Sequence, residues 1–148
     1  MSLKERLLAD LKQSMKEKDA IRKSTITMVR AAILQVEKDN KVELDDEEII
    51  GVIAKQAKQR KDAIKEFKMA DRQDLVEQNN REVEILSAYL PQQLSEEEVD
   101  QIVADTILEV GANSMKDMGR VMSAIMPKVK GRADGALINK FVKQHLQG

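Results

Sequence analysis

The side chains of this chain best suited to chemistry are the cations of its last third. Lys128, Lys130 and Arg132 alternate within five residues of a segment bounded by Gly135. Clustered cations and exposed backbone amides are enough to bind phosphate groups. Further cations lie on segments that must pack beside this loop. The candidate RNA-binding set is therefore Lys116, Arg120, Lys128, Lys130, Arg132, Lys140 and Lys143.

Charge is separated along this part of the chain, although the whole chain carries a formal charge of only −1. Residues 95–110 hold six acids and no base, whereas residues 115–148 hold seven bases and two acids. Only three aromatic residues exist, so a stacking platform for single strands is not expected. Backbone and shape recognition of a folded RNA is the remaining nucleic-acid hypothesis. The alternative is a solvated basic face that offsets the acidic segment.

Asp134 complicates the basic loop. If its carboxylate caps the following helix, it occupies the position that a bound phosphate would take. A phosphate would then lie beside Lys130 and Arg132 and not on the helix end. Gly131 and Gly135 are explained by turn geometry.

Catalytic chemistry finds little support in the residue types present. The only histidine, His145, lies near the end of the last helix, where a partial positive charge suits the helix dipole. The acids Glu96–Glu98 resemble a metal cluster in composition, but acids in a first helical turn are explained by the same dipole. No cysteine and no glycine-rich phosphate loop is present. No catalytic residue, metal or cofactor is expected.

Four helices are predicted over the first 90 residues, because apolar residues recur with helical period. They span about residues 2–17, 20–38, 46–69 and 72–89, with capping boxes at Ser2 and Asp45. The apolar face of the first helix is predicted to include Leu8 and Met15, and that of the fourth Leu75 and Val83. Arg60 falls on the apolar stripe of the third helix. It is expected to be paired, packing one helix on the next.

Three further helices are predicted over about residues 95–109, 115–126 and 134–146. Ser95 and Ser114 are expected to cap the first two, with Asp117 closing the second cap, and Pro127 is expected to end the second. The fold class is all-α and multihelical. An N-terminal four-helix unit (residues 1–90) and a C-terminal three-helix tail domain (residues 95–148) are joined by a linker at residues 91–94.

Two exposed faces offer an alternative to RNA binding, namely a helical protein-interaction module. One is the methionine stripe Met115, Met118, Met122 and Met126, which is also explained as core in a small unit with few aromatics. The other is the lysine face of the third helix, for which solvation is the simpler explanation. It consists of Lys55, Lys58, Lys61, Lys65 and Lys68.

Several motifs resemble the GatB/YqeY family, which includes the B subunit of the tRNA-dependent amidotransferases and small free-standing relatives. In the tail they are KDMG, MP and KGRADG, and upstream they are KQRKDAIKEF, DLVEQ and YLPQQLSEEE. The chain is most similar to the free-standing YqeY-like members, because only the helical and tail parts are present. Arg120 stands where the family pattern has Lys. The matching tail positions are Lys116, Asp117, Met118, Gly119, Met126, Pro127, Lys130, Gly131, Arg132, Ala133, Asp134 and Gly135.

The resemblance implies a function that the residues alone leave open. In the amidotransferases, a carbon–nitrogen ligase family with glutamine as the amido donor, this tail helps to hold tRNA by shape, and the chemistry belongs to a separate catalytic part. We therefore expect a non-catalytic tRNA-binding accessory module. An aminoacyl-tRNA synthetase or amidotransferase is a possible partner. An amidotransferase in its own right is the least favoured hypothesis.

Location is the last expectation from the sequence. No apolar run approaches the roughly 20 residues that a membrane span requires. The first residues, Met1 to Glu5, begin a charged helix and do not have the pattern of a signal peptide. With no cysteine in the chain, these features predict a cytoplasmic protein with no membrane partner.

Overall fold

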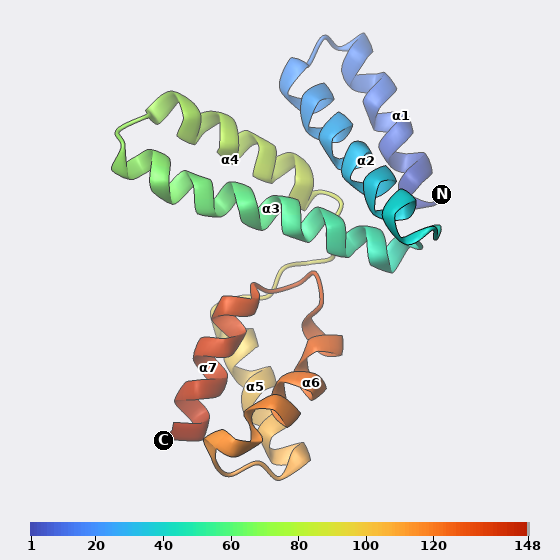
Figure 1. Cartoon of the computed structure of the whole chain (residues 1–148). Helices are drawn as coiled ribbons and strands as arrows, with labels where there is room; N and C mark the ends of the chain where they lie inside the picture. Colours follow the sequence, from blue (N-terminus) through green and yellow to red (C-terminus); the bar gives the residue numbers. More distant parts are fainter. Residues whose placement is uncertain (148) are drawn as a thin grey trace. The chain divides into compact units, whose positions relative to one another are not determined.

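The computed structural model describes residues 1–147, and within them it contains seven α-helices, one short 3-10 helix and no strand (Figure 1). The all-α prediction is confirmed. Contacts divide the chain into two compact units, one from Met1 to Leu90 and one from Pro91 onward. Gly148, the last residue of the expected tail domain, lies outside the described residues.

The first unit consists of two helical hairpins, which are visible in Figure 1. Helices α1 (Leu3–Lys16) and α2 (Ala20–Asn40) form the first, and α3 (Asp46–Met69) and α4 (Gln73–Ser87) form the second. Helix α2 contacts both α3 and α4, which joins the hairpins around one core. The fully buried aliphatic side chains of that core are Leu7, Ile26, Val29, Ile49, Ile53 and Leu86.

Side-chain caps fix where these helices begin. Asp45 and Glu48 form the expected reciprocal capping box of α3. The Ser2 hydroxyl accepts a hydrogen bond from the Glu5 N–H. Helix α2 runs two residues further than predicted, to Asn40, and ends where Lys41 takes a left-handed conformation (φ 53°).

Arg60 lies where the sequence placed it, inside the first unit and paired. The residue is 7% exposed, and its Nε lies 3.6 Å from Glu82 Oε2 of α4. Nη1 donates hydrogen bonds to the Gln56 backbone carbonyl and side-chain oxygen at 3.1 and 2.8 Å. The buried cation therefore ties α3 to α4, as expected.

Two of the predicted apolar faces were wrong in part. Leu8 and Met15 of α1 are 38% and 54% exposed, whereas Leu7 is buried in the core and Leu3 and Leu11 pack against it. In α4 the buried aliphatic side chains include Val76 and Ile85, and not Leu75 or Val83. Packing against α3 decides which face of α4 is buried, and the apolar periodicity of α4 by itself does not define that face.

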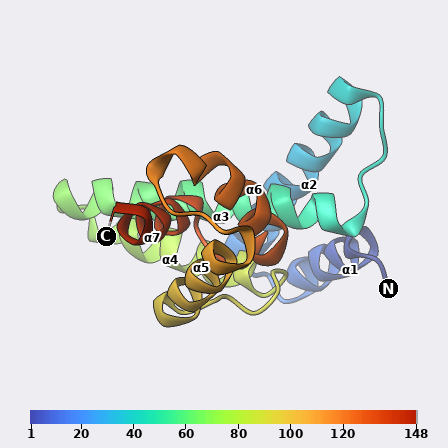
Figure 2. The same ribbon diagram turned by 90° about the horizontal axis from the view of Figure 1, so that it is seen from below.

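The second unit consists of three helices around a separate core. They are α5 (Glu96–Val110), α6 (Met118–Val129) and α7 (Gly135–Gln147), and each contacts the other two (Figure 2). Ser95 and Glu98 form the expected capping box, and Gly111 (φ 66°) ends α5 in the left-handed conformation. The buried side chains of this core are Val99, Val103, Val121, Ile125, Val129, Ile138, Val142 and Leu146.

The start and end of the sixth helix differ from the prediction. Ser114 makes no side-chain cap, and a 3-10 turn, Met115–Asp117, precedes α6. Asp117 instead accepts a hydrogen bond from the Asn113 N–H (3.1 Å). Pro127 lies inside the last turn of α6, where it removes one N–H donor without ending the helix. Val129, two residues beyond Pro127, is 1% exposed and belongs to the core, so its burial stabilises this last turn.

The methionine stripe is divided by this packing. Met118 and Met122 are half-buried against the second core, which agrees with their interpretation as core residues. Met115 and Met126 are 38% and 43% exposed, so the core interpretation was wrong for them. Val121, Ile125 and Val129 form the buried line of α6 in their place.

Candidate nucleic-acid interface

The basic loop between α6 and α7 is fastened to the segment that precedes α5. The Arg132 backbone carbonyl accepts a hydrogen bond from the Leu94 N–H (2.8 Å). Arg132 Nε donates to the Gln92 carbonyl (3.2 Å), and Gln93 Nε2 donates to the Gly131 carbonyl (2.7 Å). Gly131 has a φ of 73°, which favours glycine, so the turn and these three bonds fix the path of the loop.

Asp134 closes the helix end that an anion would otherwise use. Its Oδ1 accepts a hydrogen bond from the Ala136 N–H (2.9 Å), and its backbone carbonyl accepts from Leu137 and Ile138. This is the capping role considered from the sequence. An incoming phosphate must therefore contact the side chains of the loop and not the first turn of α7.

Lys128 is positioned differently from its neighbours in sequence. It belongs to α6, and its Nζ donates to Thr106 Oγ1 (3.0 Å) and pairs with Glu109 Oε2 (2.8 Å), both on α5. Thr106 is fully buried, and its hydroxyl in turn donates to the Ile102 carbonyl (2.7 Å). Lys128 thus links two helices, and its charge is already matched.

Lys116 and Arg120 lie at the opposite end of α6 from the loop. Arg120 pairs with Asp117 at 3.2 Å, one turn before it. The twelve residues of α6 separate this end from Lys130 by about 18 Å at 1.5 Å per residue. The two groups are therefore not one continuous site.

Lys140 and Lys143 are both exposed on α7. Their spacing of three residues places them on the same side of the helix. Lys140 Nζ lies 5.8 Å from the centre of the Phe141 ring, within cation–π range. These two lysines form the part of the candidate set on α7.

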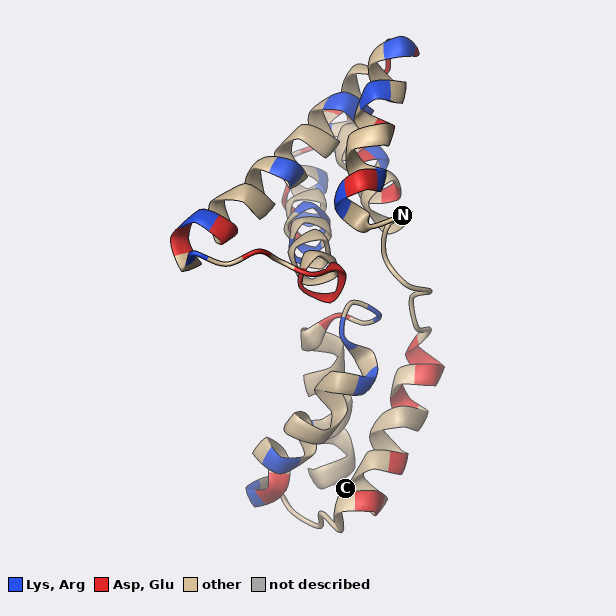
Figure 3. Ribbon diagram, turned by 90° about the vertical axis from the view of Figure 1, so that its right-hand side faces the viewer, with Lys and Arg blue, Asp and Glu red and all other residues tan. Residues whose placement is uncertain are grey.

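The seven candidate cations thus form three groups: the loop end with Lys128, Lys130 and Arg132, the α7 pair, and the start of α6. In Figure 3 the acidic residues follow α5, and basic residues colour the loop and both ends of α6. The acidic and basic residues that are separated along the sequence therefore also lie on different elements of the folded unit. The sequence did not indicate how strongly Lys128 and Arg132 are engaged by the protein itself.

The remaining candidates for chemistry have structural partners. His145 Nε2 lies 2.6 Å from Asp100 Oδ1, which joins α7 to α5. Glu96, Glu97 and Glu98 occupy the first turn of α5, where the helix dipole favours them. Within residues 1–147, no three His, Cys, Asp or Glu side chains are arranged to hold a metal ion. No helix in the described residues is long and apolar enough to span a membrane.

Sequence reasoning missed a polar cluster in the first unit. It lines a cavity of about 390 Å³. The Tyr89 hydroxyl donates to Asp10 Oδ2 (2.5 Å), and the Arg6 guanidinium lies 4.5 Å from the centre of the Tyr89 ring. Arg22 pairs with Asp10 (3.5 Å) and Arg81 with Asp19 (3.4 Å). Three arginines opposed by carboxylates join α1, α2 and α4, and no local pattern connects residues so far apart.

Fold and charge together define an all-helical, two-unit protein with a basic loop and α7 in its C-terminal unit. A family model described as "Yqey-like protein" matches residues 4–146. The chain belongs to this family, as the motifs KDMG and KGRADG indicated.

Curated relatives agree with this assignment. A protein of Pyrenophora tritici-repentis is 33% identical over 144 residues, which cover 94% of this chain and 78% of the relative. One of Kluyveromyces lactis is 42% identical, covering 70% of this chain and 58% of the relative. Both are named "Altered inheritance of mitochondria protein 41, mitochondrial". A shorter match, 38% identical over 36% of this chain and 9% of the relative, is to a glutamyl-tRNA(Gln) amidotransferase subunit of Thermococcus gammatolerans.

The cytoplasmic location expected from the sequence is corrected by these relatives. The proteins that match over most of this chain are named mitochondrial, and they point to mitochondria and not to the cytoplasm. The lack of cysteines and apolar spans did not discriminate between these compartments, because neither feature reports on a targeting address.

Proposed function

We propose that the second unit is a non-catalytic module that binds folded tRNA through its sugar–phosphate backbone. The observation that carries this proposal is the separation of charge within the unit. Acids occupy α5, while Lys130, Arg132, Lys140 and Lys143 lie on the loop and α7. Backbone contacts need clustered cations and no base-reading groups. The similarity to an amidotransferase subunit named for glutamyl-tRNA(Gln) supports tRNA as the RNA class.

Within this proposal the seven cations have unequal roles. Lys140 and Lys143 are exposed and bind phosphates directly. Lys130 and Arg132 add contacts from a loop that the linker holds in place. Lys116 and Arg120 form a separate group at the far end of α6, where they contact other phosphates. Lys128 contributes mainly to α5–α6 packing.

The test is binding of the purified protein to a tRNA transcript between about 50 and 200 mM salt. Each phosphate contact contributes roughly 0.7–0.9 to the slope of log K against log salt. The double variant Lys140→Gln/Lys143→Gln should reduce that slope by about 1.5. The matched control, Lys55→Gln/Lys61→Gln, removes two exposed cations of α3 in the other unit and should leave the slope unchanged. Equal effects of both doubles, or no binding at low salt, would exclude the proposal.

A helical protein-interaction module is the second candidate, and one observation favours it. Met115, in the 3-10 turn before α6, and Met126, in the last turn of α6, are 38% and 43% exposed. Exposed methionines suit adaptable apolar contacts. Binding of such a protein partner should depend little on salt. The Met126→Ser variant should bind the partner more weakly, while its affinity for tRNA should equal that of the wild type. An amidotransferase or synthetase is the partner class that would combine both roles.

A further inference from the structure

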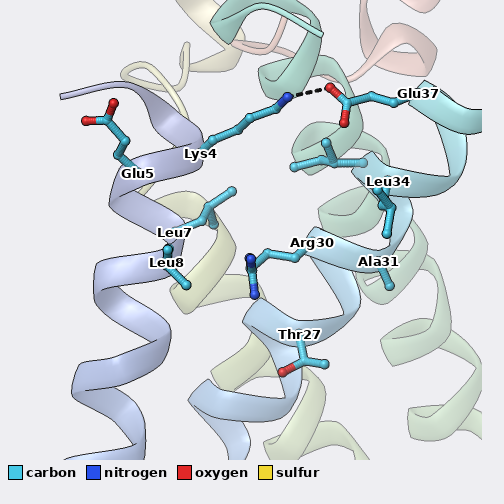
Figure 4. A pocket seen from close by; sticks show the side chains of 10 residues that line it. Lys4, Glu5, Leu7, Leu8, Thr27, Arg30, Ala31, Leu34 and Glu37 are labelled. Carbon is cyan, nitrogen blue, oxygen red and sulfur yellow. Dashed lines mark hydrogen bonds and ion pairs between the residues drawn. The ribbon is translucent and has the colours of Figure 1, made fainter. Parts of the chain in front are cut away.

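A groove between α1 and α2 lies in the first unit, and none of the candidate RNA-binding cations lines it. Its volume is about 460 Å³, within the range of small-molecule sites. The wall on α1 includes Leu7 and Leu8, and the wall on α2 runs from Thr27 to Glu37 (Figure 4). The floor reaches the core, because Leu7 is 1% exposed.

The mouth of this groove exposes aliphatic side chains. Leu34 is 65% exposed and Leu8 is 38% exposed, and Figure 4 shows both beside the space between the helices. Ala31 adds a third apolar group, on the α2 wall that also carries Leu34. A single exposed leucine needs no explanation, but apolar residues on both walls of one hollow favour an apolar occupant.

Charge at one end of the groove is neutralised within the protein. Lys4 Nζ forms a hydrogen-bonded ion pair with Glu37 and lies 3.6 Å from Glu43. The hydrogen bond to Glu37 raises the pKa of Lys4, and the same contact, followed by the Leu44 N–H, lowers the pKa of Glu37. Glu5 also lines the groove, but its side chain points away from it in Figure 4.

Arg30 is the cation of the groove that remains available. Figure 4 shows its side chain reaching from α2 into the space beside α1. Within residues 1–147, it has no hydrogen-bond or ion-pair partner, unlike Arg6, Arg22, Arg60, Arg72, Arg81 and Arg120. A guanidinium beside leucines matches an anionic group on an apolar ligand.

The length of the groove suits an extended chain. Thr27 to Glu37 spans ten residues of α2, or about 15 Å at 1.5 Å per residue. Leu7, Leu8 and Leu34 line this length, and Arg30 lies among them. An extended hydrocarbon chain with one anionic end matches that arrangement of apolar and cationic groups.

We propose that the groove binds an amphipathic anion, a single hydrocarbon chain ending in a carboxylate. The chain lies along Leu7, Leu8 and Leu34, and the carboxylate pairs with Arg30. This site is separate from the RNA proposal and does not depend on it, because every residue involved belongs to the first unit.

The test uses dansyl-undecanoate, a fluorescent fatty acid, on the full chain. Its fluorescence should rise on binding, and laurate below its micelle concentration should displace it. Dodecanol should compete roughly tenfold less well than laurate, since it lacks the charge that strengthens a bond to Arg30. Arg30→Gln should remove this preference, and Leu34→Ser, a change at an exposed position, should weaken both competitors.

Lys23→Gln is the matched control, because Lys23 is another exposed cation of α2 that does not line the groove. It should bind dansyl-undecanoate as the wild type does. The proposal is overturned if the probe does not bind, if laurate and dodecanol compete equally in the wild type, or if Lys23→Gln and Arg30→Gln have the same effect. Displacement by an amphipathic helical peptide but not by laurate would also overturn it and assign the groove to a protein partner.

Discussion

Arg60 Nε lies 3.6 Å from Glu82 Oε2 in the interior of the first unit, with both residues under 10% exposed. The Arg60 Nε makes no hydrogen bond within the described residues, so the Glu82 carboxylate compensates its charge without a close contact. A buried pair of this kind holds α3 against α4 and is costly to break from one side.

We expect Glu82→Ala to lower the free energy of unfolding of the first unit by about 3 kcal/mol or more, because it leaves a buried guanidinium without a counter-charge. The single tyrosine, Tyr89, lies in this unit, so tyrosine fluorescence during urea unfolding measures it selectively. The double variant Arg60→Met/Glu82→Leu should return to within about 1 kcal/mol of the wild type. A loss below about 1 kcal/mol in Glu82→Ala would contradict the structural role of the pair.

Tyr89 should make the stability of the first unit depend on alkaline pH. Burial, and then the hydrogen bond to Asp10, raise the pKa of Tyr89 above its ordinary value of 10.0. The folded state therefore holds a proton that the unfolded state releases above about pH 10. The contribution of Tyr89 to the free energy of unfolding is therefore fully present below about pH 10, and it is lost as the pH rises towards the pKa of the folded state.

Absorbance of tyrosinate, followed as pH is raised, checks this expectation. Asp10→Asn should lower the apparent pKa of Tyr89 by removing its carboxylate acceptor, and Tyr89→Phe should abolish this contribution to the pH dependence. Ionisation of Tyr89 at its ordinary pKa in the folded wild type would show that the hydroxyl is not held as the structure has it.

Two glycines of the second unit should respond to alanine in opposite directions. Gly111 has a φ of 66°, so Gly111→Ala should cost about 1 kcal/mol of stability through backbone strain. Gly119 lies in α6, and an added Cβ there meets nothing within 4 Å, so Gly119→Ala should gain up to about 1 kcal/mol. Amide hydrogen exchange of Val103 in α5 reports unfolding of this unit.

The same Gly119→Ala variant informs the RNA proposal. If the backbone near Gly119 contacts a phosphate closely, this variant should bind tRNA more weakly while being more stable. Unchanged binding would assign Gly119 no part in recognition.

Lys128 should affect stability more than RNA binding. Lys128→Gln loses the ion pair with Glu109 and weakens the hydrogen bond to the buried Thr106 hydroxyl, so we expect a cost of about 1 kcal/mol. Its tRNA affinity should fall less than that of Lys143→Gln, an equal change of charge at an exposed position on α7. A larger fall in Lys128→Gln would mean that RNA displaces Glu109 as the partner.

The sequence by itself determined the all-helical fold and most helix starts. Helical periodicity and caps such as Asp45 and Ser95 act within four residues, so they can be read without the rest of the chain. The buried Arg60 was also evident, because a cation on an apolar stripe must find a partner. Family motifs in the tail supplied the expectation of RNA binding.

Only the tertiary structure decided which of these residues are free to bind a ligand. Helix α6 continues past Pro127, Val129 is buried in the core, and Lys128 contacts α5. Arg132 is tied to Gln92, 40 residues away, and the groove at Arg30 exists only because α1 and α2 pack side by side. Such contacts join segments far apart in the chain. Local propensity cannot specify them, because their free energy comes from burial and pairing between helices.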